Sequence, residues 1–78
     1  MPRTFSEIAK DIRKNWQNMS PAAEPYVEAL AEINSSDKKA RYYFEDAETI
    51  VLYFLSNAGT WRGPEAKRIK NELKSMLG

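Results

Sequence analysis

The chain contains no cysteine and no histidine among its 78 residues. Without cysteine it has no disulfide framework, no thiolate metal site and no cysteine nucleophile, and a small domain without disulfides is compatible with the reducing cytosol. Without histidine it also lacks the side chain that most often acts as a general acid or base. We therefore expect no catalytic residue, no cofactor, no metal ion and no small-molecule substrate.

An excess of charge of one sign and a long apolar run are also missing. Twelve Lys or Arg residues against eleven Asp or Glu residues leave a net charge of +1, so no overall field favours nucleic acid, membranes or acidic substrates. No apolar stretch approaches the ~20 residues of a membrane span, and the amino terminus lacks the apolar core of a signal peptide. We expect a cytoplasmic protein that is not bound to membranes.

Length and composition indicate one globular domain over residues 1–78. The chain is 42% hydrophobic and 29% charged, with three Gly and four Pro, which is typical of folded rather than disordered proteins. A domain of this size buries only about 60% of the surface of its unfolded chain. That leaves little room for a deep catalytic cleft.

Residues 4–18 carry the clearest amphipathic pattern. The sequence Thr4-Phe5-Ser6-Glu7 has the form of a capping box, in which the Thr4 hydroxyl accepts from the Glu7 amide and the Glu7 carboxylate accepts from the Thr4 amide. The apolar residues share an arc of roughly 100° on a helical wheel: they are Phe5, Ile8, Ala9, Ile12, Trp16 and Met19. We predict a helix whose apolar side, including Trp16, faces the core.

Residues 21–34 predict a second helix. Pro21 follows Ser20 at a position where proline is well tolerated, but Pro25 conflicts with a continuous helix. The regular helix is therefore expected to start at Glu24 or Pro25. Three glutamates repeat at four-residue spacing on the side away from the apolar residues, where like charges repel: they are Glu24, Glu28 and Glu32. This row is either a solvated face or the site of a basic partner.

The most apolar stretch, residues 50–55, predicts a third helix over residues 45–58. Asp46 is suited to cap its start, and Gly59 is expected to end it in a left-handed conformation. The stretch is also rich in β-branched and aromatic residues, as a buried strand would be, but its apolar positions extend on both sides at helical spacing. We predict a helix.

Two connections contain candidate functional residues. Residues 34–41 are polar and form the main loop, which continues into the aromatic run Tyr42-Tyr43-Phe44; one or two of these rings are expected to close the end of the core. The second connection, Gly59 to Gly63, contains Trp61 and Arg62.

The last helix is expected over residues 64–77, with Gly63 as its N-cap and Pro64 as its first residue. It separates its charges by side: Arg68 is spaced to pair with Glu72 on one flank, and a row of Lys67, Lys70 and Lys74 occupies the other. The predicted fold is thus an all-α domain of four short helices, at residues 4–18, 21–34, 45–58 and 64–77, around a central third helix.

Several function classes fit the sequence poorly. An enzyme would have to work with carboxylates, lysines and tyrosines alone. The glycines around Trp61 match no nucleotide-binding spacing, and at the following helix start Pro64 removes an amide donor and Glu65 repels an anion. The same glutamate, and a connection longer than usual, weaken a helix-turn-helix. We predict a protein that is not an enzyme.

Protein–protein interaction is the favoured prediction. Leu52 and Tyr53 are apolar residues on the outer side of the third helix, and Trp61 and Arg62 are residue types enriched at interface hot spots. These four residues form the predicted binding site. The partner is another protein or a second copy of the chain, as a homo-oligomer.

Nucleic-acid binding is the alternative. Cations would hold phosphates, and Tyr42 or Tyr43 would stack on bases; the basic residues concerned are Lys38, Lys39, Arg41, Arg62, Lys67, Lys70 and Lys74. The two hypotheses differ in surface layout. Interaction predicts that Leu52 and Trp61 are exposed, and nucleic-acid binding predicts that the cations of the loop and of the last helix share one face.

A family resemblance covers most of the chain. The run from Tyr53 to Gly63, the segment Ala66-Lys67-Arg68-Ile69-Lys70 with Leu73, and the opening Thr4-Phe5-Ser6-Glu7-Ile8 carry it. In these stretches the chain resembles small uncharacterised proteins encoded on bacterial mobile elements and prophages. The resemblance implies a bacterial accessory protein that acts by binding a protein or DNA, and it assigns no functional residue.

Overall fold

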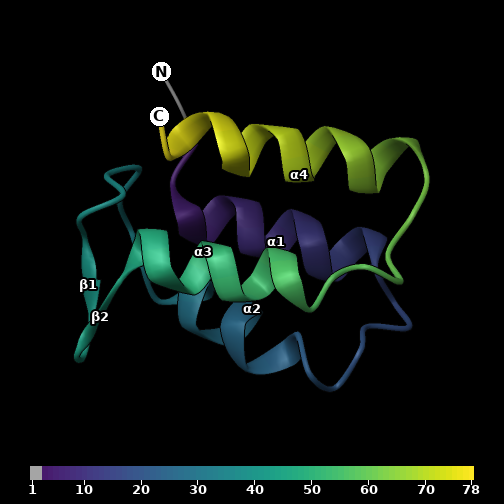
Figure 1. The fold of residues 1–78 in the computed structure, drawn as a ribbon, viewed down its shortest axis with the longest axis horizontal. Helices are drawn as coiled ribbons and strands as arrows, with labels where there is room; N and C mark the ends of the chain where they lie inside the picture. Colours follow the sequence, from purple (N-terminus) through teal and green to yellow (C-terminus); the bar gives the residue numbers. More distant parts are fainter. Residues whose placement is uncertain (1–2) are drawn as a thin grey trace.

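A computed structural model describes residues 3–78, and its elements are four helices and one short hairpin (Figure 1). The helices are α1 (Phe5–Asn15), α2 (Glu24–Ala31), α3 (Ala47–Ser56) and α4 (Pro64–Met76), and the strands are β1 (Arg41–Tyr42) and β2 (Glu45–Asp46). The four predicted helices are confirmed, each shorter than predicted. The prediction of a purely all-α fold is wrong, because β1 and β2 pair as an antiparallel hairpin. The first two residues of the predicted domain lie outside the described part.

The predicted N-terminal caps of α1 and α3 are present. The Glu7 amide donates to the Thr4 hydroxyl at 3.1 Å, and the Thr4 amide donates to the Glu7 carboxylate at 2.8 Å, so the capping box is complete. The Asp46 carboxylate accepts from the Thr49 amide at 2.9 Å and from the Thr49 hydroxyl at 2.7 Å. These bonds satisfy amides that a helix start leaves without a partner.

Two prolines set the starts of α2 and α4. Helix α2 begins at Glu24 with Pro25 in its first turn, as expected from the conflict that Pro25 would create in a longer helix. Helix α4 begins at Pro64 with Gly63 as its N-cap. The expectation for Gly59 is wrong: α3 ends at Ser56, its C-cap residue Asn57 has a negative φ, and the positive φ in this connection belongs to Gly63.

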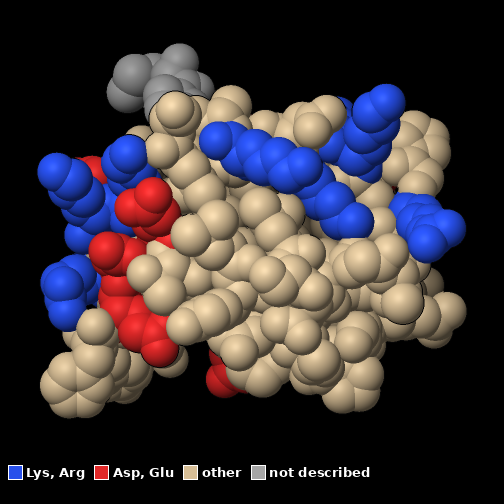
Figure 2. All heavy atoms as spheres, in the orientation of Figure 1, with Lys and Arg blue, Asp and Glu red and all other residues tan. Residues whose placement is uncertain are grey.

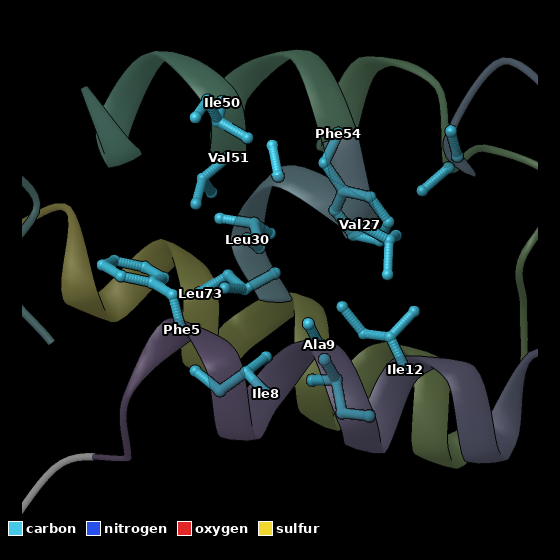
Figure 3. Close-up of a cluster of buried hydrophobic side chains, with 14 of the residues drawn as sticks. Phe5, Ile8, Ala9, Ile12, Val27, Leu30, Ile50, Val51, Phe54 and Leu73 are labelled. Carbon is cyan, nitrogen blue, oxygen red and sulfur yellow. The ribbon is translucent and has the colours of Figure 1, made fainter. Parts of the chain in front are cut away.

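The core receives side chains from all four helices, and Figure 3 shows them converging. The largest fully buried side chains are Phe5, Ile8, Ile12, Val27, Leu30, Val51, Phe54, Ile69 and Leu73. Every one of them lies on an apolar face that the sequence predicts. Helix α1 packs extensively against α2 and α4, and α2 also packs extensively against α3.

An ion-pair network joins α1 to α4. Arg3 donates to Asp11 at 3.0 Å and also pairs with Glu72, while Arg68 donates to Asp11 at 3.2 Å and to Glu65 at 2.8 Å. The predicted pair between Arg68 and Glu72 is wrong, because both side chains reach partners outside that spacing. Burial acts to raise the pKa of Asp11, but hydrogen bonds from Arg3 and Arg68 outweigh it and the pKa is lowered.

The caps predict that the domain loses stability in acid. The hydrogen bond from the Thr4 amide lowers the pKa of Glu7, and the bond from the Thr49 hydroxyl lowers the pKa of Asp46. The ordinary values in the unfolded chain are about 4, so this stabilisation is complete above pH ~4 and declines as pH falls through the lower folded values. Thermal unfolding followed by circular dichroism between about pH 7 and pH 2 measures it.

The control is Asp46→Asn, since asparagine also caps helices well but does not titrate. Its melting temperature should fall less over the acid range than that of the wild type. If the melting temperature fell equally with pH in both proteins, the titration of Asp46 would not contribute to the loss of stability.

Candidate functional site

The β1–β2 hairpin exposes two aromatic rings at its tip. Tyr42 is opposite Glu45 in the ladder, so Tyr43 and Phe44 form the connecting turn. Their side chains are 81% and 92% exposed, whereas Tyr42 packs against the core as the closing ring that the sequence predicts. The Arg41 guanidinium donates to the Phe44 carbonyl at 2.8 Å across the turn. The hairpin therefore holds two large rings in solvent.

Tyr43 has a strained backbone. Its φ is +58°, and among residues 3–78 no other non-glycine residue has a positive φ. A bulky residue in this region is a conformational outlier, of a kind that clusters at functional sites when the surrounding structure maintains it. The strain and the exposure fall on the same residue.

Beside this turn lies a hollow of about 230 Å³, which we call the aromatic groove. Its walls come from α2, the hairpin and α3: the lining residues are Pro25, Tyr26, Ala29, Tyr42, Tyr43, Phe44, Glu45 and Ile50. Tyr53 extends the aromatic surface along α3, because its ring centroid lies 5.6 Å from that of Tyr26. Four of its lining residues are aromatic: Tyr26, Tyr42, Tyr43 and Phe44.

The charged groups at the aromatic groove include both signs. Glu45 lines it directly, and the Arg41 guanidinium donates to the carbonyl of Phe44, another lining residue. Burial, followed by the charges of Tyr43, Glu32 and Glu28, raises the pKa of Tyr42. Within residues 3–78, none of these three glutamates takes part in an ion pair.

The predicted protein-binding residues do not form one surface. Leu52 and Tyr53 are about half exposed, at 51% and 48%, as predicted. The expectation of an exposed Trp61 is wrong: it is 5% exposed and its ring stacks on that of Trp16, with centroids 5.2 Å apart and planes 8° apart. Arg62 is exposed but belongs to another groove, described next. Phe44 belongs to neither predicted site, although it is exposed. The sequence signal for an exposed ring here is the run of three adjacent aromatic residues after a polar loop.

A second hollow, of about 650 Å³, runs along α4, and we call it the basic groove. Its lining residues are Trp61, Arg62, Gly63, Pro64, Ala66, Lys67, Lys70, Asn71 and Lys74. The Lys70 ammonium donates to the carbonyls of Ala58 and Trp61, each at 2.7 Å, and so ties α4 to the preceding connection. Burial, then the neighbouring charges of Lys74 and Arg62, lowers the pKa of Lys70.

The predicted nucleic-acid residues fall into two groups. Figure 2 shows one group of Lys and Arg over α4 and another at the hairpin end, where Asp and Glu are mixed with it. Arg41 lies in the hairpin with Tyr42 and Tyr43, and Lys38 donates to the Leu77 carbonyl at 2.9 Å, beyond the last turn of α4. Lys39 is exposed in the loop between them. Both groups are visible from the same side of the molecule in Figure 2, but they do not form one continuous patch.

Residues 3–78 contain no cluster of three or more Asp or Glu side chains that could hold a metal ion. In that range no helix is both long enough and apolar enough to span a bilayer. The displaced carboxyl pKa values, at Glu7, Asp11 and Asp46, are all lowered by hydrogen bonds that hold helix starts or ion pairs in place.

Comparisons with protein-family models, with curated proteins and with solved structures gave no match to this chain. The function is therefore inferred from the two grooves and their residues.

Proposed function

We propose that the chain is a non-enzymatic protein-binding module, and that the aromatic groove binds a basic, apolar segment of a partner protein. The observation that supports this most is the exposed, strained aromatic turn beside the groove. Burying a large apolar side chain such as Phe44 contributes about 1.5–3 kcal/mol. A site of this kind supplies an aromatic anchor, and aromatic residues are enriched at the centres of interfaces.

The unpaired glutamates support a basic partner. Glu28, Glu32 and Glu45 make no ion pair in the described residues, so a segment carrying Lys or Arg beside its apolar anchor would neutralise them. A second copy bound symmetrically through the same groove would bring the two sets of these glutamates together. Charge complementarity therefore favours a different protein over a homo-oligomer. An accessory protein of a bacterial mobile element, as the family resemblance implies, is a role that such a module fits.

A displayed library of random peptides, selected on the wild-type protein and counter-selected on the Tyr43→Ser/Phe44→Ser variant, tests this proposal. We expect enriched peptides with an aromatic or aliphatic anchor next to Lys or Arg. Their affinity should fall at least about tenfold for Phe44→Ser, which is about 1.4 kcal/mol, and should weaken as salt is raised.

The matched control is Leu52→Ser, which also removes an exposed apolar side chain but lies outside the groove lining. Peptide affinity should be unchanged in this variant. Sedimentation velocity should show a monomer. Peptides that bind both variants equally would contradict the proposal, as would a dimer that depends on Phe44.

A further inference from the structure

The basic groove concentrates positive charge that nothing in the described residues neutralises. Among residues 3–78, its four cations take part in no ion pair; this is also true of the cations Lys10, Lys14, Lys38, Lys39 and Arg41, whereas Arg3, Arg13 and Arg68 are paired. The four groove cations are Arg62, Lys67, Lys70 and Lys74. The net charge of the chain is +1, so subtracting the +4 of these residues leaves −3 for all the others. The positive field is local and belongs to α4.

Helix α4 keeps its acidic residues away from the groove. Glu65 and Glu72 are held by Arg68 and Arg3 on the α1 side, and no carboxylate occurs among the groove residues described. Figure 2 shows the resulting strip of Lys and Arg over α4 without Asp or Glu beside it. An anion that enters the groove therefore meets cations and no repelling group.

One of the cations is fixed in place. Lys70 spends two of its three ammonium donors on the carbonyls of Ala58 and Trp61. Its side chain is therefore held, with one donor left. Burial, and after it the nearby charges of Lys74 and Arg62, lowers its pKa. A bound anion would relieve that repulsion. Pre-organised cations bind an anion without the entropy cost of ordering long side chains.

The spacing of the cations fits a phosphate backbone. Lys67, Lys70 and Lys74 lie along one helix, and seven residues of α-helix rise about 10.5 Å. Each strand of a duplex presents a phosphate about every 3.4 Å of axis, so about three phosphates match this length. No exposed aromatic ring is available for stacking in the groove, because Trp61 is buried, and single strands are normally bound by such stacking.

We infer that the basic groove binds the phosphate backbone of a double-stranded nucleic acid without reading its sequence. This site is separate from the aromatic groove and does not use Tyr42, Tyr43 or the loop cations. An acidic peptide is a different class of ligand, and polyglutamate represents it in the test.

The test is a fluorescence-anisotropy titration at several salt concentrations with labelled duplex DNA, duplex RNA, single-stranded DNA and polyglutamate. With three to four phosphates contacted, the plot of log K against log salt for a duplex should have a slope of about −3. The duplex that binds more tightly identifies the natural source of the phosphates. Tighter binding of single-stranded DNA or of polyglutamate would overturn the inference, as would no duplex binding at low salt.

Two variants with the same charge change provide the matched comparison. Lys67→Gln/Lys74→Gln removes two exposed groove cations and leaves the structural Lys70 intact, while Lys10→Gln/Lys14→Gln removes two exposed lysines of α1. The groove variant should bind a duplex at least about tenfold more weakly, and the slope should shrink by about two. The α1 variant should differ from the wild type by less than about twofold. Equal losses in both would show a general charge effect and overturn the assignment to the groove.

Discussion

Trp61→Ala should lower the free energy of unfolding by about 3–5 kcal/mol. Trp61 is 5% exposed, its ring stacks on Trp16, and its edge meets Phe54 with ring centroids 6.4 Å apart. The substitution removes the contacts of one ring with two others and leaves a cavity that the rigid helices cannot fill. Because domains are stable by roughly 0.05–0.15 kcal/mol per residue, or about 4–12 kcal/mol for this chain, the loss is a large part of the stability of the fold.

Urea unfolding followed by circular dichroism measures this loss. Phe44→Ala is the control, because it also truncates an aromatic residue but at a position that is 92% exposed; its stability should lie within about 0.5 kcal/mol of the wild type. If Trp61→Ala were as stable as the control, the Trp61 indole would be at the surface, as the predicted binding site requires. The second step is a double-mutant cycle with Trp16→Ala, which should give a coupling of about 0.5–1.5 kcal/mol for the stacked pair.

The helices were predictable because their signals are local. The Thr4–Glu7 capping box, the Asp46 cap and the Gly63-Pro64 start each depend on residues within four positions of one another. Apolar spacing then identified which side of each helix is buried. Such signals do not depend on the path of the rest of the chain, so the sequence alone contains them.

The hairpin was not predictable in the same way. Strands of two residues are too short to show alternation, and a tight turn is normally signalled by Gly, Asn or Asp where φ is positive. Here Tyr43 takes that conformation. The aromatic run instead suggested core closure, which is correct for Tyr42 alone.

Site residues in connections were the least predictable. Trp61 lies between two helices, where no periodicity applies, and its burial depends on the connection passing over Trp16. Glu72 is spaced to pair with Arg68. In the structure Arg68 pairs with Asp11 on α1 and with Glu65, and Arg3 pairs with Glu72. Competition of this kind is decided by tertiary structure. The lysine row on α4 was predicted, whereas its groove requires the 59–63 connection to be in place.

Gly63→Ala should lower the free energy of unfolding by about 1–3 kcal/mol. Gly63 has φ 111° and ψ 175°, a region that is essentially restricted to glycine. A Cβ added there meets no atom within 4 Å, so a steric clash with neighbouring residues is not the cause. The cost comes from the backbone of the residue itself, and urea unfolding of the variant measures it.

Gly59→Ala separates this backbone effect from the general effect of replacing a glycine. An added Cβ at Gly59 also meets nothing within 4 Å, and this residue does not have a positive φ. Its replacement should be neutral or stabilising by up to about 1 kcal/mol, because alanine reduces the entropy of the unfolded chain. If both variants lost the same stability, the conformation of Gly63 would not be what directs the chain from Trp61 into α4. If only Gly63→Ala loses stability, that conformation is what sets the start of α4, and with it the position of Arg62 relative to Lys67 across the basic groove.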